Sequence, residues 1–148
     1  MVMNNEPNQM QDQMLRSEAI ERLKKAGVTP TQQRVEIAQI LFARPQHVSA
    51  EQVLSIVNAQ SSVVSKATVY NTLNLFVRCG LVREVNVDGQ RVYYDSTTRP
   101  HHHFFNVDTG ELTDIPKEAV RLATLPELPP GTEPESVEVV VRVRQKRI

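Results

Sequence analysis

Cysteine is almost absent from this 148-residue chain, which has Cys79 alone. An internal disulfide and a Cys-x-x-Cys zinc clip are therefore both excluded. No apolar run approaches the roughly 18–20 residues that a membrane-spanning helix needs. The polar first residues have neither the basic start nor the apolar stretch of a signal peptide. These absences predict a soluble protein in a reducing compartment, by default the cytoplasm.

The chain also lacks net charge, because 17 basic residues balance 17 acidic ones. The charges are unevenly distributed along the sequence. Residues 1–14 carry two acidic side chains and no basic one, residues 15–95 carry ten basic and seven acidic ones, and residues 96–148 carry seven and eight. The mildly basic middle segment is compatible with nucleic-acid binding but does not by itself indicate it.

Helix signals follow one another in the first half of the chain. The polar leader at 1–14 is expected to be disordered. Apolar residues at helical spacing then predict a helix over 15–26, which Gly27 stops. Two capping boxes, Thr29–Gln32 and Ser49–Gln52, predict the starts of a second and a third helix.

A fourth helix is expected from the capping residue Ser65 to Gly80. Two β-rich runs follow on either side of Asp88-Gly89, which is typical of a β-hairpin. Four helices followed by a hairpin predict a winged helix-turn-helix DNA-binding domain over residues 15–95.

A change in composition predicts a hinge at 96–100 and a second domain at 101–148. This domain is expected to contain a hairpin around Asp108–Gly110, a short helix over 116–124 and a last strand within 136–145. A domain of about 50 residues has little core of its own, so we expect it to pair with a second copy. The predicted fold class is α+β, with an N-terminal winged helix-turn-helix domain followed by a small α/β dimerisation domain.

The fourth helix is amphipathic. Its apolar side is formed by Val69, Leu73, Phe76 and Val77, and its opposite side has Ala67, Asn71, Asn74 and Arg78. Small and amide side chains let a helix approach the major groove closely, and a lysine at its start suits a phosphate. The candidate DNA-binding residues are therefore Arg34, Lys66, Tyr70, Asn71 and Asn74. The alternative is an ordinary amphipathic surface helix, which the preceding helices and the wing make the weaker interpretation.

Three of the four histidines lie in one run, His101, His102 and His103. Side chains alternate in an extended segment, so the imidazoles of His101 and His103, about 7 Å apart, can chelate one metal ion while His102 points away. The second hairpin would bring Asp114 back near them, and Asp95 lies six residues before His101.

Together with the remaining histidine, these side chains offer three imidazole nitrogens and two carboxylates. The candidate metal ligands are His47, Asp95, His101, His103 and Asp114. Such a set without thiolate suits Fe(II) or Mn(II), and Zn(II) less selectively. The alternative is a solvated histidine run with unrelated aspartates.

Several motifs taken together resemble the ferric uptake regulator family over roughly residues 15–148. They are HVSAEQV at 47–53, SKATVYNTLNLF at 65–76, GLV at 80–82 and HHHFF at 101–105. The resemblance implies a homodimeric winged-helix repressor of double-stranded operator DNA with no membrane partner. It also implies a base contact from Tyr70, a DNA-backbone contact from Arg34, and one regulatory Fe(II) or Mn(II) site per subunit. The family's sensing site matches His47, Asp95, His101, His103 and Asp114.

The ligand spacing looks like that of the peroxide-sensing branch of the family. In that branch Fe(II) and peroxide oxidise a ligating histidine, which here would be His47 or His101. The Cys-x-x-Cys sequence that usually follows the histidines is replaced by Asn106–Thr109, and the second cysteine pair is missing. No structural zinc site made of four cysteines is therefore expected.

In lacking these cysteines the chain looks more like the iron response regulators of proteobacteria, which sense iron through heme. That resemblance implies heme binding at His101, His102 and His103. The Gly-Cys-Pro heme motif of some members has no counterpart here, because Cys79 is followed by Gly80. Cys79 itself, near the end of an amphipathic helix, is expected to be a core residue.

Three functions remain open at this point. The first is a metal- or heme-responsive transcriptional regulator of the repressor type, which controls iron homeostasis or the peroxide response and is not an enzyme. The second is a constitutive winged-helix DNA-binding protein whose histidines are incidental. The third is a small non-heme iron enzyme, which the short chain and the absence of tryptophan disfavour. The sequence leaves open which signal is sensed and whether the ligand promotes or abolishes DNA binding.

Overall fold

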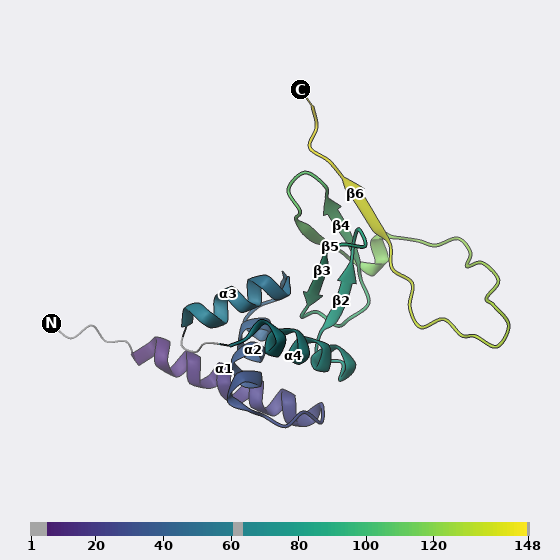
Figure 1. Ribbon diagram of the computed structural model, residues 1–148. Helices are drawn as coiled ribbons and strands as arrows, with labels where there is room; N and C mark the ends of the chain where they lie inside the picture. The colour runs from purple at the N-terminus through teal and green to yellow at the C-terminus, as the bar shows by residue number, and fades with distance from the viewer. Residues whose placement is uncertain (1–5, 61–63, 148) are drawn as a thin grey trace. The chain divides into compact units, whose positions relative to one another are not determined.

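The computed structural model describes residues 6–60 and 64–147. The chain divides into two compact units, Met1–Thr98 (unit 1) and Arg99–Ile148 (unit 2), each of which mixes regular elements with loops (Figure 1). The boundary between the units lies within the segment 96–100, where the sequence predicts a hinge. In the described part of the chain, no helix is both long and apolar enough to cross a lipid bilayer.

Unit 1 combines helices with a small sheet. The helices are α1 (Glu6–Lys25), α2 (Gln32–Phe42), α3 (Ala50–Gln60) and α4 (Lys66–Arg78). The antiparallel sheet has the order β1-β3-β2, with β1 (His47–Val48), β2 (Arg83–Asn86) and β3 (Val92–Asp95). The helices bury an apolar core, whose largest fully buried members include Leu23, Ile37, Leu41, Leu73 and Phe76.

Local signals set the helix ends of unit 1. Ser49 and Gln52 form the expected capping box, in which each side chain accepts the backbone N–H of the other, at 3.2 and 2.9 Å. Ser65 caps α4 by accepting a backbone N–H three residues on. Gly27 and Gly80 end α1 and α4, with φ angles of +79° and +75°. In each case the glycine and the residue after it donate their backbone N–H groups to carbonyls of the last helical turn, as in a Schellman motif. These predicted boundaries are confirmed.

Two helix starts differ from the expectation. Helix α1 begins at Glu6, so residues 6–14 are helical rather than a disordered leader, while residues 1–5 lie outside the described residues. Glutamine and methionine favour the helical conformation, and Pro7 is tolerated in the first turn of a helix. The helix predicted from residue 15 can therefore extend back through residues 6–14 without an apolar stripe. The N-cap of α2 is Thr31 rather than Thr29.

Unit 2 is built on a second three-stranded sheet with the order β5-β4-β6. Strand β4 (His102–Asn106) pairs antiparallel with β5 (Leu112–Ile115) and parallel with β6 (Val140–Val143). The hairpin predicted around Asp108–Gly110 joins β4 and β5, and Gly110 has the positive φ angle of +77° that its turn requires.

The expected helix over 116–124 is wrong. A single 3₁₀ turn, η1 (Lys117–Ala119), stands in its place, and the chain then runs without regular structure to β6, as the long loop in Figure 1 shows. Four prolines between residues 126 and 134 remove backbone donors and prevent a helix from continuing. The last strand is also shorter than the expected run of residues 136–145.

Apolar burial is slight in unit 2. Phe105 and Ile115 are the buried apolar side chains among its described residues. In contrast, Phe104, Leu122, Leu125 and Val141 are between 38% and 52% exposed. Exposed apolar side chains of this size are the ones that a protein partner would cover.

Candidate metal centre and DNA-facing helix

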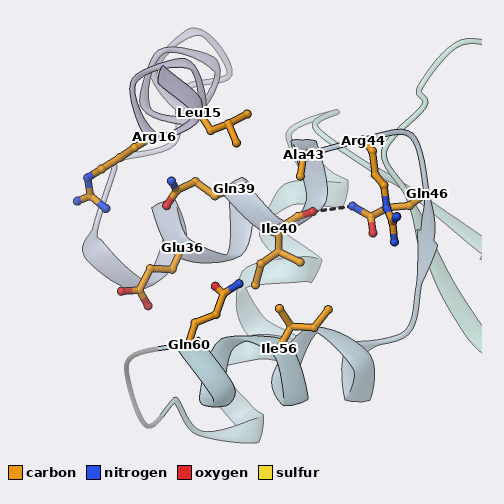
Figure 2. A pocket seen from close by; sticks show the side chains of 10 residues that line it. All are labelled: Leu15, Arg16, Glu36, Gln39, Ile40, Ala43, Arg44, Gln46, Ile56 and Gln60. Atoms are coloured by element: carbon orange, nitrogen blue, oxygen red, sulfur yellow. Dashed lines mark hydrogen bonds between the residues drawn. The ribbon is translucent and has the colours of Figure 1, made fainter. Parts of the chain in front are cut away.

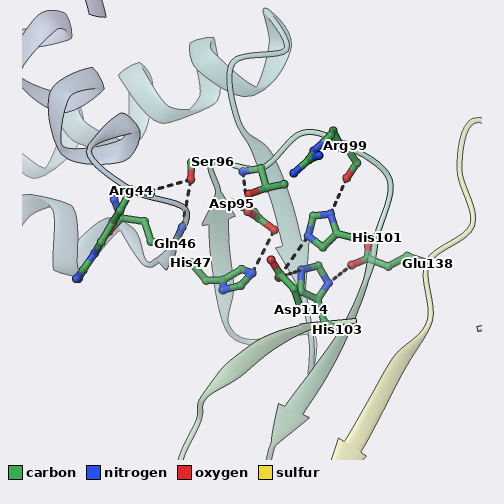
Figure 3. A network of polar contacts seen from close by, with 11 residues as sticks. Arg44, Gln46, His47, Asp95, Ser96, Arg99, His101, His103, Asp114 and Glu138 are labelled. Carbon is green, nitrogen blue, oxygen red and sulfur yellow. Dashed lines mark hydrogen bonds and ion pairs between the residues drawn. The ribbon is translucent and has the colours of Figure 1, made fainter. Parts of the chain in front are cut away.

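Two histidines and an aspartate of unit 2 converge at the start of the β4–β5 pair. His103 lies directly opposite Asp114 in the strand register, and His101 precedes β4 on the same side. The Nε2 atoms of His101 and His103 each lie 3.5 Å from Asp114 Oδ1 (Figure 3). The two rings, whose centroids are 4.5 Å apart, meet at an angle of 66°. We call these three residues the unit-2 triad.

The other ring nitrogen of each triad histidine faces an oxygen atom. His101 Nδ1 lies 2.5 Å from the Arg99 carbonyl oxygen, and His103 Nδ1 lies 2.7 Å from Glu138 Oε1. Carbonyl and carboxylate oxygens only accept hydrogen bonds, so each Nδ1 donates, and in a neutral ring Nε2 then carries the lone pair. When both rings are neutral, both lone pairs therefore face the Asp114 carboxylate, which is itself an acceptor.

Acceptor atoms that converge in this way fit a divalent cation. The three ligand atoms of the triad lie within 4.8 Å of one another. Hydrogen bonds from Nδ1 to a carbonyl and a carboxylate are those by which proteins fix the tautomer and orientation of metal-bound histidines. The donor set of imidazole nitrogens and a carboxylate, without sulfur, is the one expected for Fe(II) or Mn(II).

His102 has a different environment from its neighbours, as strand alternation predicts. Its Nδ1 accepts the backbone N–H of Val139 at 2.9 Å, and the His103 N–H is donated to the Val139 carbonyl. All three histidines are buried. His102 therefore ties the segment before β6 to β4 and lies outside the triad.

Unit 1 has a smaller pair of the same chemistry. His47 in β1 and Asp95 in β3 are opposite one another in the strand register, and His47 Nε2 lies 3.2 Å from Asp95 Oδ2 (Figure 3). Asp95 is almost fully buried, and its Oδ1 accepts the backbone N–H of Thr97 at 2.8 Å. This hydrogen bond fixes one carboxylate oxygen and leaves the other facing the imidazole.

The residue before His47 anchors strand β1. The Gln46 side chain donates to the carbonyl oxygen of Ile40 at 2.6 Å (Figure 2). It also donates to the carbonyl oxygen of Leu41 at 3.3 Å, and both acceptors lie in the last turn of α2. The Gln46 backbone N–H is donated to Ser96 Oγ at 3.2 Å. A two-residue strand would be marginal by itself, so these contacts hold the imidazole in place.

The outer face of α4 is exposed as the sequence predicts. Lys66, Ala67, Asn71, Asn74 and Arg78 are exposed, and Val69, Leu73 and Phe76 are buried. Val77 differs from the expectation, since it is half-buried at the edge of the core. Thr72 takes its place among the buried residues of the helix.

Tyr70 has a defined partner on α3. Its hydroxyl donates to Glu51 Oε1 at 2.6 Å, and the Lys66 ammonium lies 5.8 Å from its ring centroid. The hydrogen bond from Tyr70 lowers the pKa of Glu51 and raises the pKa of Tyr70. At neutral pH, Glu51 is therefore a carboxylate and Tyr70 keeps its proton.

Arg34 lies at the start of α2. Its backbone N–H is donated to the N-cap oxygen of Thr31 at 3.3 Å, and its guanidinium donates to the Thr29 carbonyl at 2.9 Å. Arg34 and Asn71 line one surface hollow between α2 and α4. The five DNA-binding candidates therefore all belong to unit 1.

The ferric uptake regulator family matches residues 25–127 of the chain. The chain belongs to this family. The ferric uptake regulation protein of Pseudomonas aeruginosa is 39% identical over 95 residues, which are 63% of this chain and 71% of that protein. The peroxide-responsive repressor PerR of Staphylococcus epidermidis is 31% identical over 98 residues, 66% of this chain. That match spans 65% of the relative's own length.

A solved structure of the ferric uptake regulator from Pseudomonas aeruginosa with manganese is similar to this family member. The TM-score is 0.65 and the identity is 34%, with 86% of this chain and 97% of the other covered. The predicted α+β fold class, with N-terminal helices and a small C-terminal sheet domain, is confirmed. The family predicted from the sequence motifs is confirmed as well.

Sequence reasoning missed two carboxylates of this family member. Glu138 is one of four glutamates between residues 127 and 138, and nothing in their spacing distinguishes it. It reaches His103 because β6 runs parallel to β4 and sets Val140 opposite His103. Glu51 was recognised as part of a helix start, but its contact with Tyr70 is made between two helices.

Proposed function

We propose that this protein is a metal-responsive transcriptional repressor that binds operator DNA as a homodimer. One observation carries the proposal most directly: the unit-2 triad directs acceptor atoms at a common point. The exposed α4 face in unit 1 supports the DNA-binding part. Family membership supports both parts, and the relatives' names describe ferric uptake regulation and a peroxide response.

The regulatory ion is Fe(II) or Mn(II), at one site per subunit. His101, His103 and Asp114 hold it from unit 2 with nitrogen and oxygen donors, as these two ions accept. Manganese is named for the solved Pseudomonas aeruginosa regulator, which supports the choice. When bound, the ion contributes positive charge that neutralises the carboxylates, while the protein sets the donors' positions.

His47 and Asp95 of unit 1 complete the coordination of the same ion. Asp95 and His101 are six positions apart, so the intervening chain spans at most about 20 Å. The pair has the same donor chemistry as the triad and, like it, comes from paired strands. An ion that takes ligands from both units favours one arrangement of them, and only such a difference in affinity can switch DNA binding.

On the DNA side, Tyr70, Asn71 and Asn74 contact base edges in the major groove. Lys66 and Arg34 contact phosphates, as cationic side chains at helix starts commonly do. The mildly basic segment 15–95, with ten basic and seven acidic side chains, agrees with this assignment. The homodimer forms through unit 2, and dimerisation covers the exposed apolar side chains of that unit. Sedimentation at micromolar protein concentration tests the dimer, and a monomer under these conditions would contradict it.

Heme is the weaker ligand candidate at the histidine run. His101, His102 and His103 are buried, and each uses Nδ1 in a contact within unit 2. A flat macrocycle needs an open face, so these contacts favour a single ion. A constitutive DNA binder is also less favoured, because one relative is named for ferric uptake regulation and the other for a peroxide response. The members of this family are regulators. A repressor that binds operator DNA acts in the compartment that contains the DNA, which is the cytoplasm.

Gel-shift titrations on duplexes selected by the protein test the proposal. We expect Mn(II) or Fe(II) to change the affinity for DNA, and heme to leave it unchanged. His101→Ala should lower metal affinity, whereas Tyr70→Ala should weaken DNA binding and leave metal affinity intact. DNA affinity that ignores both ions would contradict the sensor role, and failure to select any duplex would contradict DNA binding.

A further inference from the structure

The hydrogen bond between Glu51 and Tyr70 joins the start of α3 to the outer face of α4. Its length of 2.6 Å makes it a strong, charge-assisted bond. Tyr70 is half-buried, and Glu51 is exposed, so the pair lies at the surface that α4 presents. The two side chains line one hollow together with Asn74 and Arg91.

A phenolic hydroxyl has one proton to give and lone pairs with which to accept. In this structure the proton is committed to Glu51. The pKa of Tyr70 is raised and that of Glu51 is lowered by this same contact, so the donor and acceptor roles hold at neutral pH. The hydroxyl can then only accept from a third group.

This restriction has a consequence for reading bases. In the major groove, the exocyclic amines of adenine and cytosine are donors, whereas guanine offers two acceptors and thymine offers a carbonyl acceptor. Phosphate oxygens are acceptors too. A tyrosine hydroxyl that cannot donate is attracted by the amines and repelled by the acceptors.

We propose that Glu51 is a specificity-determining residue that polarises Tyr70 to select adenine or cytosine at one position of each operator half-site. The inference rests on the proposed DNA-binding function. Glu51 acts through Tyr70 as a positioning residue, and the hydroxyl of Tyr70 makes the contact. The neighbouring Lys66 ammonium offsets the negative charge of Glu51 and contacts the phosphate backbone.

The test selects bound duplexes from a library of randomised DNA sequences, with the full-length protein in the presence of Mn(II). The base preferences of the wild type and of Glu51→Ala are then compared. In the wild type we expect adenine or cytosine at one position of each half-site. In the variant, that preference should fall by about 2- to 12-fold, the range of one net hydrogen bond. Thermal unfolding of both proteins checks that the variant is folded.

Glu84→Ala is the matched control for charge. Glu84 lines the same hollow, and its side chain accepts a hydrogen bond from Asn86. Replacing Glu84 therefore removes an equal negative charge and leaves the Glu51–Tyr70 hydrogen bond in place. We expect Glu84→Ala to alter the salt dependence of DNA binding and to retain the base preference. An unchanged preference in Glu51→Ala, or an equal loss in Glu84→Ala, would overturn the inference.

Tyr70→Phe separates the relay from direct reading by Glu51. We expect Tyr70→Phe to lose the preference for adenine or cytosine to the same extent as Glu51→Ala. The double variant with both substitutions should lose no more of this preference than either single variant. A preference that survives Tyr70→Phe would assign the contact to Glu51 itself and overturn the relay. A wild type that selects no sequence at all would instead contradict the proposed function.

Discussion

Among single residues, Glu138 has the clearest expected effect on how well unit 2 would hold a cation. Its carboxylate accepts from Nδ1 of His103, which keeps the proton away from the nitrogen that faces Asp114. Loss of a residue that orients a metal-bound histidine in this way commonly lowers metal affinity by roughly 10- to 100-fold. We therefore expect Glu138 to contribute to metal binding without being a ligand.

We predict that Glu138→Ala weakens Mn(II) binding by roughly 10- to 100-fold. Glu138→Gln should lose less, because its amide oxygen can still accept from Nδ1. Calorimetric titration of the full-length protein measures both. Glu135→Ala, an exposed residue of the same loop, is the matched control and should bind as the wild type does. Equal affinity in Glu138→Ala and Glu135→Ala would exclude the role of Glu138.

At the scale of elements, what the sequence predicted depended on local signals. Capping residues marked the starts of α3 and α4, and glycines of positive φ marked the ends of α1 and α4, because each satisfies backbone groups within a few residues. The convergence of His101, His103 and Asp114 was predictable, because strand alternation and a hairpin bring them together. The two-residue β1 was missed, since contacts of Gln46 with α2 and Ser96 support it from outside.

Elements that depend on distant partners were also the ones predicted wrongly. The start of α1 was set too late, because helix propensity without an apolar stripe gave no signal before residue 15. The helix over 116–124 was predicted wrongly, because Leu122 of this segment is exposed in unit 2 and local helix propensity is not reinforced by packing against a buried core. Glu138 and Glu51 both reach their partners through contacts between elements, and a single sequence carries no pattern for such contacts.

The capping box next to His47 gives a prediction at this scale. Ser49→Ala should lower the free energy of unfolding by about 1 kcal/mol, because the Gln52 N–H loses its acceptor at the start of α3. Urea titration followed by circular dichroism measures the change. Ser55→Ala, an exposed position within α3, is the control and should shift stability by no more than about 0.5 kcal/mol. A cost as large in Ser55→Ala would show that the cap is not its source.

At the scale of the whole molecule, the two units differ in what stabilises them. Unit 1 has the apolar core, whereas the described part of unit 2 buries few apolar side chains. Under the proposed function, metal ligation and dimerisation would supply stability that unit 2 lacks, because any partner that binds only the folded state shifts the unfolding equilibrium. The absence of a second cysteine leaves no thiolate zinc site to do this instead.

We predict that Mn(II) at a hundred times its dissociation constant raises the free energy of unfolding by about 2.7 kcal/mol. His101→Ala should lose most of this gain, since it removes a triad nitrogen. Thr113→Ala, an exposed neighbour of Asp114 on β5, should keep it. Urea titrations with and without Mn(II) measure all three proteins. Stabilisation of His101→Ala equal to that of the wild type would place the ion elsewhere.

Coupling between metal binding and DNA binding is the central claim, and His47→Ala tests it most directly. The variant leaves the unit-2 triad intact, so it still binds Mn(II), but it removes a ligand from unit 1. Fluorescence anisotropy with a selected operator duplex measures DNA affinity in Mn(II) and in chelator. For the wild type we predict a change of roughly 5- to 150-fold, and for His47→Ala almost none. A response to Mn(II) in His47→Ala as large as that of the wild type would contradict the claim.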